Sequence, residues 1–253
     1  MLQIPDQSLF FWSIVSLAVL IIGISKGGFG GGLGVVSTPL LAFVMPVADG
    51  AALLLPILIA ADIYNVYRYW DHIDWHNIRV HLPWAFVGVV LGSFAFNYLA
   101  ANESTFKLVL GIVSLSFVLF QGTRGIIFGR LDTLVYPRWV QSLLGTITGF
   151  TSTIAHVGGP PLTISLLPQK LPRQTYVGTF LFFFLALNLV KLIPYGYLGL
   201  LRVGNLTLTL LMLPVVFIGT IIGIWLNGRF NEQTFQVVMY IFLTLTGLQL
   251  IFG

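Results

Sequence analysis

The sequence is poor in charged residues and has no cysteine at all. Only 8% of its 253 residues are charged and 57% are hydrophobic, whereas a soluble domain has roughly 25% charged residues. The mean hydropathy is +0.95. Too little polar surface remains to cover a soluble globule, so the chain is predicted to be an integral membrane protein. The absence of cysteine excludes disulfides, iron–sulfur clusters and thiolate metal sites.

Several functional classes lack their sequence signals. The net charge is +4, and its scattered groups are typical of cytoplasmic loops rather than of nucleic-acid binding. No nucleophile elbow, zinc-protease pattern or Walker A loop is present. We therefore expect no enzyme, no metal and no cofactor. His72, His76 and His81 fall in a polar segment that is expected to be an exposed amphipathic loop.

Ten apolar runs follow one another along the chain. A membrane-spanning helix needs about 20 such residues, and the runs at 33–46 and 159–168 are shorter, as is typical of re-entrant segments. The pattern predicts an all-α, polytopic helical bundle with about eight to ten membrane segments. No basic residue precedes the first run, so we expect no cleaved signal peptide. The runs are 8–24, 33–46, 48–67, 82–100, 106–122, 139–154, 159–168, 174–193, 205–226 and 234–252.

The two halves of the chain, 1–125 and 126–253, resemble each other. Gly28 and Pro39 match Gly149 and Pro160 at a constant offset of 121 residues. Other matches keep the same order along the chain: Asn65 to Arg68 with Asn188 to Lys191, Leu82-Pro83 with Leu213-Pro214, and Glu103 with Glu232. Such duplication is the usual construction of secondary transporters. The sequence therefore predicts two homologous repeats within one transmembrane domain.

The basic residues predict how the repeats are oriented. If the repeats are inverted, nine of the twelve lysines and arginines face one side of the membrane and three face the other. If Lys26 is placed inside the membrane, the split is eight against three. If each interrupted pair of runs is a single crossing, the split is seven against four. Because cytoplasmic loops are enriched in lysine and arginine, the inverted arrangement is favoured, with both termini outside the cytoplasm.

Two segments interrupt the apolar runs at corresponding places. Residues 23–34 include seven glycines in twelve positions, which disfavours a helix by about 1 kcal/mol per glycine. In residues 148–161 hydroxyl groups partly replace the glycines. Interrupted membrane helices line binding sites in transporters, where free amides and helix N-termini attract anions. The alternative is close helix packing through small residues.

The predicted substrate site therefore lies at the two breaks, near the membrane midplane. Its candidate residues are Lys26, Gly27, Gly28, Gly30, Gly31, Gly32, Ser37, Thr38, Asn65, Thr151, Ser152, Thr153, Gly158, Gly159 and Asn188. Lys26 has no acidic neighbour in the sequence, so either it binds an anion or it reaches the membrane surface as a snorkelling side chain.

Four further residues are candidates for gating or coupling. Asp62 and Arg68 share one helix face with Asn65, so Asp62 either pairs with Arg68 or exchanges a proton. Lys191 repeats the Asn-x-x-basic pattern after Asn188, and the two pairs are either basic vestibules or interfacial anchors. His156, in the second break, is the only histidine within the predicted membrane segments, and it is either structural or a proton carrier. For proton coupling His156 is the first candidate and Asp62 the second.

The glycine-rich patterns resemble a known family. Lys26 to Gly34, followed by Ser37-Thr38-Pro39, is similar to the N-terminal signature of the TauE/SafE family of sulfite-exporter-like permeases. Gly145 to Pro161 is similar to the second signature, and the resemblance covers nearly the whole chain. It implies a transporter of sulfite, sulfonates or related small sulfur-containing or organic anions in a cell membrane, such as the prokaryotic inner membrane.

Together these features predict a secondary transporter for a small anion that works by alternating access in the lipid bilayer. No ATP-binding segment is present, so protons, sodium or the substrate's own gradient would supply the energy. The alternatives are a passive anion channel and a non-transporting scaffold subunit. The sequence contains no signal for an oligomeric state, a transport direction or one particular substrate.

Overall fold

The computed structural model describes residues 8–28, 34–128, 134–227, 229 and 232–253, and at 124–128, 203–205, 227 and 232–236 it describes the backbone alone. This part of the chain is helical and contains no strand. The helices are α1 (Leu9–Gly28), α2 (Ser37–Leu41), α3 (Val47–Tyr69), α4 (Trp75–Ala100), α5 (Glu103–Phe128), α6 (Arg138–Ala155), α7 (Gly159–Leu166), α8 (Arg173–Tyr197), α9 (Val203–Asn227) and α10 (Glu232–Phe252). Short 3-10 turns, η1 (Gly34–Val36), η2 (Trp70–His72) and η3 (Leu167–Gln169), adjoin α2, α3 and α7.

Six helices of the described chain are long and apolar enough to cross a membrane: α1, α3, α4, α5, α8 and α9. In α10 the described apolar part is Val237–Phe252. Large apolar side chains such as Phe94, Leu119 and Ile221 are exposed on the outside of the bundle, where lipid would cover them. The chain is thus an all-α, polytopic membrane protein.

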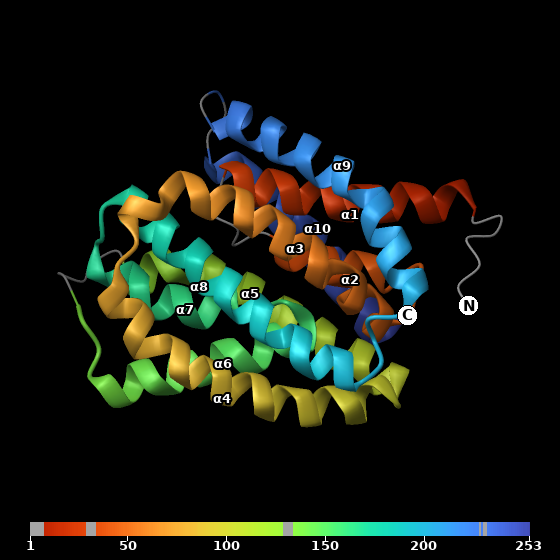
Figure 1. The fold of residues 1–253 in the computed structure, drawn as a ribbon, viewed down its shortest axis with the longest axis horizontal. Helices are drawn as coiled ribbons and strands as arrows, with labels where there is room; N and C mark the ends of the chain where they lie inside the picture. Colours follow the sequence, from red (N-terminus) through yellow and green to blue (C-terminus); the bar gives the residue numbers. More distant parts are fainter. Residues whose placement is uncertain (1–7, 29–33, 129–133, 228, 230–231) are drawn as a thin grey trace.

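The helices α2 and α7 are too short to span a bilayer. At 1.5 Å per residue they measure about 8 and 12 Å, whereas the hydrocarbon core is about 30 Å thick. They lie toward opposite ends of the bundle, α2 on the right and α7 on the left of Figure 1. The start of α1 and the end of α10 lie at the same end of the bundle.

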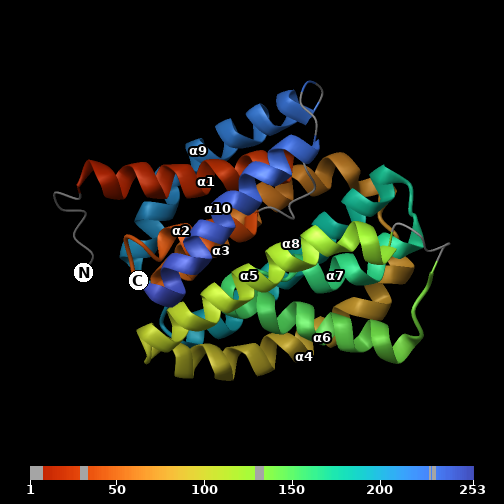
Figure 2. The same cartoon turned by 180° about the vertical axis from the view of Figure 1, so that it is seen from behind.

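Helices α1 and α6 each pack along a long helix from the other half of the chain. Helix α1 lies against α9, and α6 lies against α4, as the two opposite views agree (Figures 1 and 2). Glycine permits this close approach, because a Cβ at Gly28 would collide with the carbonyl of Gly223, and a Cβ at Gly149 with that of Ala85. The remaining principal pairs are α3 with α8 and α5 with α10. In the predicted duplication, α1, α3, α4 and α5 correspond to α6, α8, α9 and α10. If each helix is replaced by its counterpart, the same four pairs result. The duplication itself stays a prediction.

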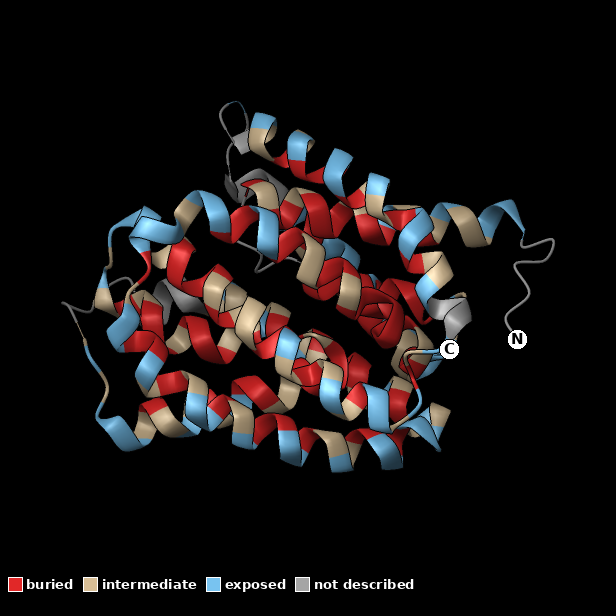
Figure 3. Ribbon diagram, viewed as in Figure 1, coloured by how far each residue is buried: buried red, intermediate tan, exposed pale blue. Residues whose placement is uncertain are grey.

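Helix α3 is the centre of the bundle. Of its most apolar 18-residue window, 72% is buried, compared with 28% to 44% for the other five membrane-length helices. Figure 3 shows buried residues on the inward faces of the helices and exposed residues on the outer faces of α4 and α9. The buried polar side chains of α3, Asp62 and Asn65, therefore have protein groups as partners.

Three element boundaries differ from those expected. Helix α1 continues to Gly28 despite its glycines, because packing against α9 compensates for their low helix propensity. Helix α4 begins at Trp75 rather than near residue 82, since Asp74 accepts hydrogen bonds from the amides of His76 and Asn77 and so caps it. Helix α5 extends to Phe128, six residues beyond the apolar run at 106–122.

Candidate functional site

A cavity of about 40 Å³ lies near the centre of the bundle, between α1, α3, α8 and the junction of α6 with α7. Roughly 10–15 Å³ on this measure holds one water molecule, so the cavity has room for a few waters or one small ion. Its polar lining consists of Lys26, Asp62, Ser152, His156, Gly159 and Asn188. Its apolar lining consists of Ile22, Val35, Leu54, Leu58, Phe180, Leu181 and Phe184.

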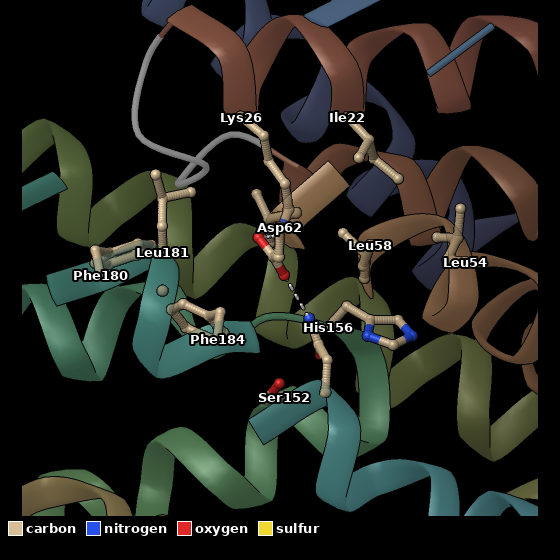
Figure 4. A pocket seen from close by; sticks show the side chains of 13 residues that line it. Ile22, Lys26, Leu54, Leu58, Asp62, Ser152, His156, Phe180, Leu181 and Phe184 are labelled. Atoms are coloured by element: carbon tan, nitrogen blue, oxygen red, sulfur yellow. Dashed lines mark hydrogen bonds and ion pairs between the residues drawn. The ribbon is translucent and has the colours of Figure 1, made fainter. Parts of the chain in front are cut away.

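A buried ion pair joins the two sides of this cavity. The Lys26 ammonium on α1 contacts Oδ1 of Asp62 on α3. The other carboxylate oxygen, Oδ2, accepts a hydrogen bond from Nδ2 of Asn188 on α8 at 2.9 Å, the dashed line in Figure 4. Asp62 is 0% exposed and Lys26 only 6%. Because a buried charge is costly without a partner, the pair explains how both groups are kept inside the protein.

The end of α6 supplies the other polar wall. His156 has φ = 56°, in the left-handed region, and ends the helix. The last carbonyls of a helix have no partner within it, and here side chains from other helices donate to them. Lys191 Nζ donates to the Ser152 carbonyl at 3.0 Å, Tyr195 to that of Thr153 at 2.8 Å and Thr38 to that of Ala155 at 2.9 Å. A cation at this position is also favoured by the negative end of the helix dipole.

Lys191 fixes the state of the His156 ring. Its ammonium lies 2.9 Å from Nδ1 of His156, and since an ammonium can only donate, Nδ1 accepts. The ring proton is then on Nε2, which donates to the Ala51 carbonyl at 2.9 Å. His156 is therefore neutral and fully hydrogen-bonded in this arrangement.

The charges around the cavity do not cancel. Two buried lysines lie near one buried carboxylate. Lys26 lines the cavity and contacts Asp62. Lys191 is outside the cavity lining, and its Nζ has three partners, the Ser152 carbonyl, Ser152 Oγ and Nδ1 of His156, which matches the three donors of an ammonium group. His156 adds no charge, and among the described residues the charged side chains that line the cavity are Lys26 and Asp62. With both lysines as ammonium groups, one positive charge is left over in a place where a positive charge is expensive. An anion of small size would neutralise it.

Several predicted site residues lie elsewhere in the structure. The side chains of Ser37, Asn65, Thr151 and Thr153 donate to backbone carbonyls, those of Ala18, Ala61, Ile147 and Gly149. Thr38 belongs to the end of α6, as described above, and Gly158 packs against Phe184 and Ser152. Ser37 and Thr38 thus link helices, whereas Asn65, Thr151 and Thr153 bond to their own helix four residues earlier, and none of these residues lines the cavity.

The glycines of the first break divide into two groups. Gly27 and Gly28 are helical and lie in the seam with α9, where a Cβ would meet Thr220 and Gly223. This is the alternative that the sequence left open, close packing through small residues. Gly30, Gly31 and Gly32 lie outside the described residues.

Two expectations about charged residues were wrong. Asp62 does not pair with Arg68, which is exposed near the end of α3, but with Lys26, 36 positions away in sequence. Lys191 is 0% exposed, so it is neither a surface anchor nor part of an outer vestibule. Both lysines have protein partners, and Lys26 does not reach the membrane surface.

The expected loop with three histidines was also wrong in part. His72 and His76 are exposed, as expected, but His81 lies on α4 and is 1% exposed. Its Nδ1 lies 2.9 Å from the Asn77 carbonyl and its Nε2 2.7 Å from Ser165 Oγ, which ties α4 to α7. Asp74 gave a sequence signal for this, since an aspartate before a helix is a common N-cap.

Sequence reasoning missed the apolar lining and the role of Tyr195. The side chains of Leu54, Leu58, Phe180 and Phe184 line the cavity, but in so apolar a chain no local pattern separates them from other core residues. Among the described residues, no group of three or more His, Asp or Glu is arranged to hold a metal.

A bundle of membrane-length helices with a charged cavity at its centre defines a multi-pass membrane protein of the transporter class. Comparison with family models gives a match to the sulfite exporter TauE/SafE family over residues 15–250, nearly the whole chain. The chain therefore belongs to this family of membrane transporters. Neither the search of curated proteins nor that of solved structures found a match.

Proposed function

We propose that the protein is a secondary transporter for a small anion, with sulfite, a sulfonate or a related sulfur-containing or organic anion as substrate. The observation that supports this most is the grouping of two buried lysines, Lys26 and Lys191, around one carboxylate, Asp62, beside a buried cavity. With both lysines as ammonium groups, this grouping has a surplus positive charge. A bound anion would remove that imbalance. The family's description supplies sulfite as the first substrate to test.

The size and walls of the cavity favour a small substrate. A volume of about 40 Å³ corresponds to a few water molecules, which suits an oxyanion of a few heavy atoms better than a large organic acid. The Lys26 ammonium has three donors, and among the described residues its partner is Asp62. The others would be available to an anion that already has Asp62 as its neighbour.

Alternating access would occur around this cavity. The helix packing agrees with inverted repeats, 1–125 and 126–253, whose broken helices approach the centre from opposite ends. Because α1 is packed on α9 and α6 on α4, each moving body would combine helices of both halves. In the cell membrane, the basic loops would face the cytoplasm and both termini the outside, with protons or sodium as candidate coupling ions.

Transport assays in proteoliposomes test this proposal. Purified protein is reconstituted, and accumulation of sulfite, thiosulfate, methanesulfonate and acetate is followed under an imposed proton or sodium gradient. Accumulation of an anion against its own gradient is expected for a transporter. Flux that only dissipates the anion gradient supports a passive channel instead, and no flux of any anion supports a non-transporting subunit.

The same assay tests the role of Lys26. Lys26→Met should weaken anion binding by about 1.5–3 kcal/mol, the range for hydrogen bonds to charged groups, or about tenfold to a hundredfold. Lys170→Met is the matched control, since Lys170 is exposed beside η3, away from the cavity. Unchanged affinity in folded Lys26→Met protein would remove Lys26 from the site.

A further inference from the structure

Asp62 occupies the position where a substrate anion would bind. Its carboxylate is a small anionic group held by the Lys26 ammonium and by the Asn188 amide at 2.9 Å. It lines the same cavity as these two partners. A substrate anion in this cavity would therefore share Lys26 with a negative charge that belongs to the protein.

The balance of charge distinguishes monovalent from divalent anions. With Lys26 and Lys191 charged, Asp62 ionised and His156 neutral, the empty site has one surplus positive charge. A monoanion neutralises the site without any other change. A dianion would leave one buried negative charge unbalanced, which is costly in a medium of low dielectric constant.

We infer that binding of a dianion makes Asp62 take up one proton from solvent, so that the protein moves dianions together with a proton and monoanions without one. This inference rests on the proposed function and names its coupling ion. The proton goes to Oδ1, the oxygen that Lys26 contacts, and the ammonium is released to the substrate. Oδ2 keeps accepting from Asn188, because a protonated carboxyl group retains a carbonyl acceptor.

The groups facing Asp62 leave it as the proton acceptor. They are Lys26 from α1 and Asn188 and Lys191 from α8, with His156 from the α6–α7 junction also lining the cavity. Lys26 and Lys191 are hydrogen-bond donors, to Asp62 and to the end of α6, and the Asn188 amide does not titrate. Both nitrogens of His156 have partners, and Nδ1 faces the Lys191 ammonium, so a second ring proton would require Lys191 to move away.

Calorimetry on the detergent-solubilised wild-type protein tests the inference directly. Thiosulfate is the divalent probe and methanesulfonate the monovalent one, and neither takes up a proton itself near neutral pH. Binding heats measured in buffers of different ionisation enthalpy give the number of protons taken up. We expect about one proton per thiosulfate and none per methanesulfonate, with thiosulfate affinity falling about tenfold per unit rise in pH by linkage. Thiosulfate binding without proton uptake would overturn the inference and leave the proposed function intact.

The variant Asp62→Asn tests which group takes the proton. The amide imitates the protonated carboxyl group, so the variant should bind thiosulfate without proton uptake and with a flat pH dependence. Asp49→Asn, in the first turn of the same helix, is the control and should keep the wild-type uptake. Proton uptake that persists in Asp62→Asn assigns the proton to another group and overturns the inference. If neither anion binds the wild-type protein, the proposed function itself fails.

Discussion

The ion pair between Lys26 and Asp62 leads to a quantitative prediction about stability. In Lys26→Met an unbranched apolar side chain replaces the lysine, and Asp62, 0% exposed, keeps only Asn188 as a partner. Removal of one member of a buried ion pair costs about 3–5 kcal/mol, because the other charge stays buried without compensation. We expect the free energy of unfolding to fall by about this amount.

A double-mutant cycle isolates the pair itself. Asp62→Asn leaves the Lys26 ammonium without its carboxylate and should also destabilise the protein, whereas the double variant Lys26→Met/Asp62→Asn removes both charges. Replacement of both members is often close to neutral, so the double variant should recover most of the lost stability. The expected coupling energy is about 3 kcal/mol.

The measurement is denaturant unfolding in detergent micelles, followed by tryptophan fluorescence or circular dichroism. Lys170→Met serves as the control, because exposed substitutions usually change stability by less than about 0.5 kcal/mol. If the destabilisation of the double variant equals the sum of the two single effects within about 0.5 kcal/mol, the two sites are independent. That result would refute the pairing and the charge balance built on it.

Three further predictions concern the helix framework. Gly149→Ala should lower stability by about 1–3 kcal/mol, the usual cost of overpacking, because its Cβ would collide with the backbone of α4. The measurement is thermal unfolding, and Gly122→Ala is the control, since nothing lies within 4 Å of a Cβ at Gly122. Tyr195→Phe should cost about 0.5–1.5 kcal/mol through loss of its hydrogen bond to Thr153, and an unchanged melting temperature would contradict this. Arg79 and Asn102 are both exposed. A single cysteine at 79 should react with an impermeant thiol reagent from the cytoplasmic side, and one at 102 from outside. The reverse pattern would contradict the proposed orientation.

Hydropathy predicted the fold class because membrane helices are long and apolar in themselves. The runs expected at 48–67 and 174–193 correspond to α3 and α8, which extend only a few residues further. Prediction failed where tertiary contacts outweigh local preference. Helix α1 includes Gly27 and Gly28 because α9 lies against them, and α9 is far away in sequence.

The candidate site was predictable in its parts and not in its pairing. Lys26, Asp62 and Asn188 stand out as polar residues in apolar runs, which marks them as functional candidates. Their contact depends on how α1, α3 and α8 pack together, and no spacing along one helix contains that information. Spacing along one helix instead suggests Arg68 as the partner of Asp62, because Arg68 is the nearest base on α3.

The seam between α1 and α9 has a consequence for biosynthesis. Helix α1 begins at Leu9 and α9 at Val203, so at about 5–20 residues per second the ribosome makes α9 on the order of 10–40 s after α1. Asp62, by contrast, follows Lys26 within seconds. The nascent first half thus has its charge partner early but presents the glycine face of α1 to lipid or to the insertion machinery until α9 arrives. Docking of α9 is a late step of assembly, and a chain truncated before Val203 would retain that uncovered face permanently.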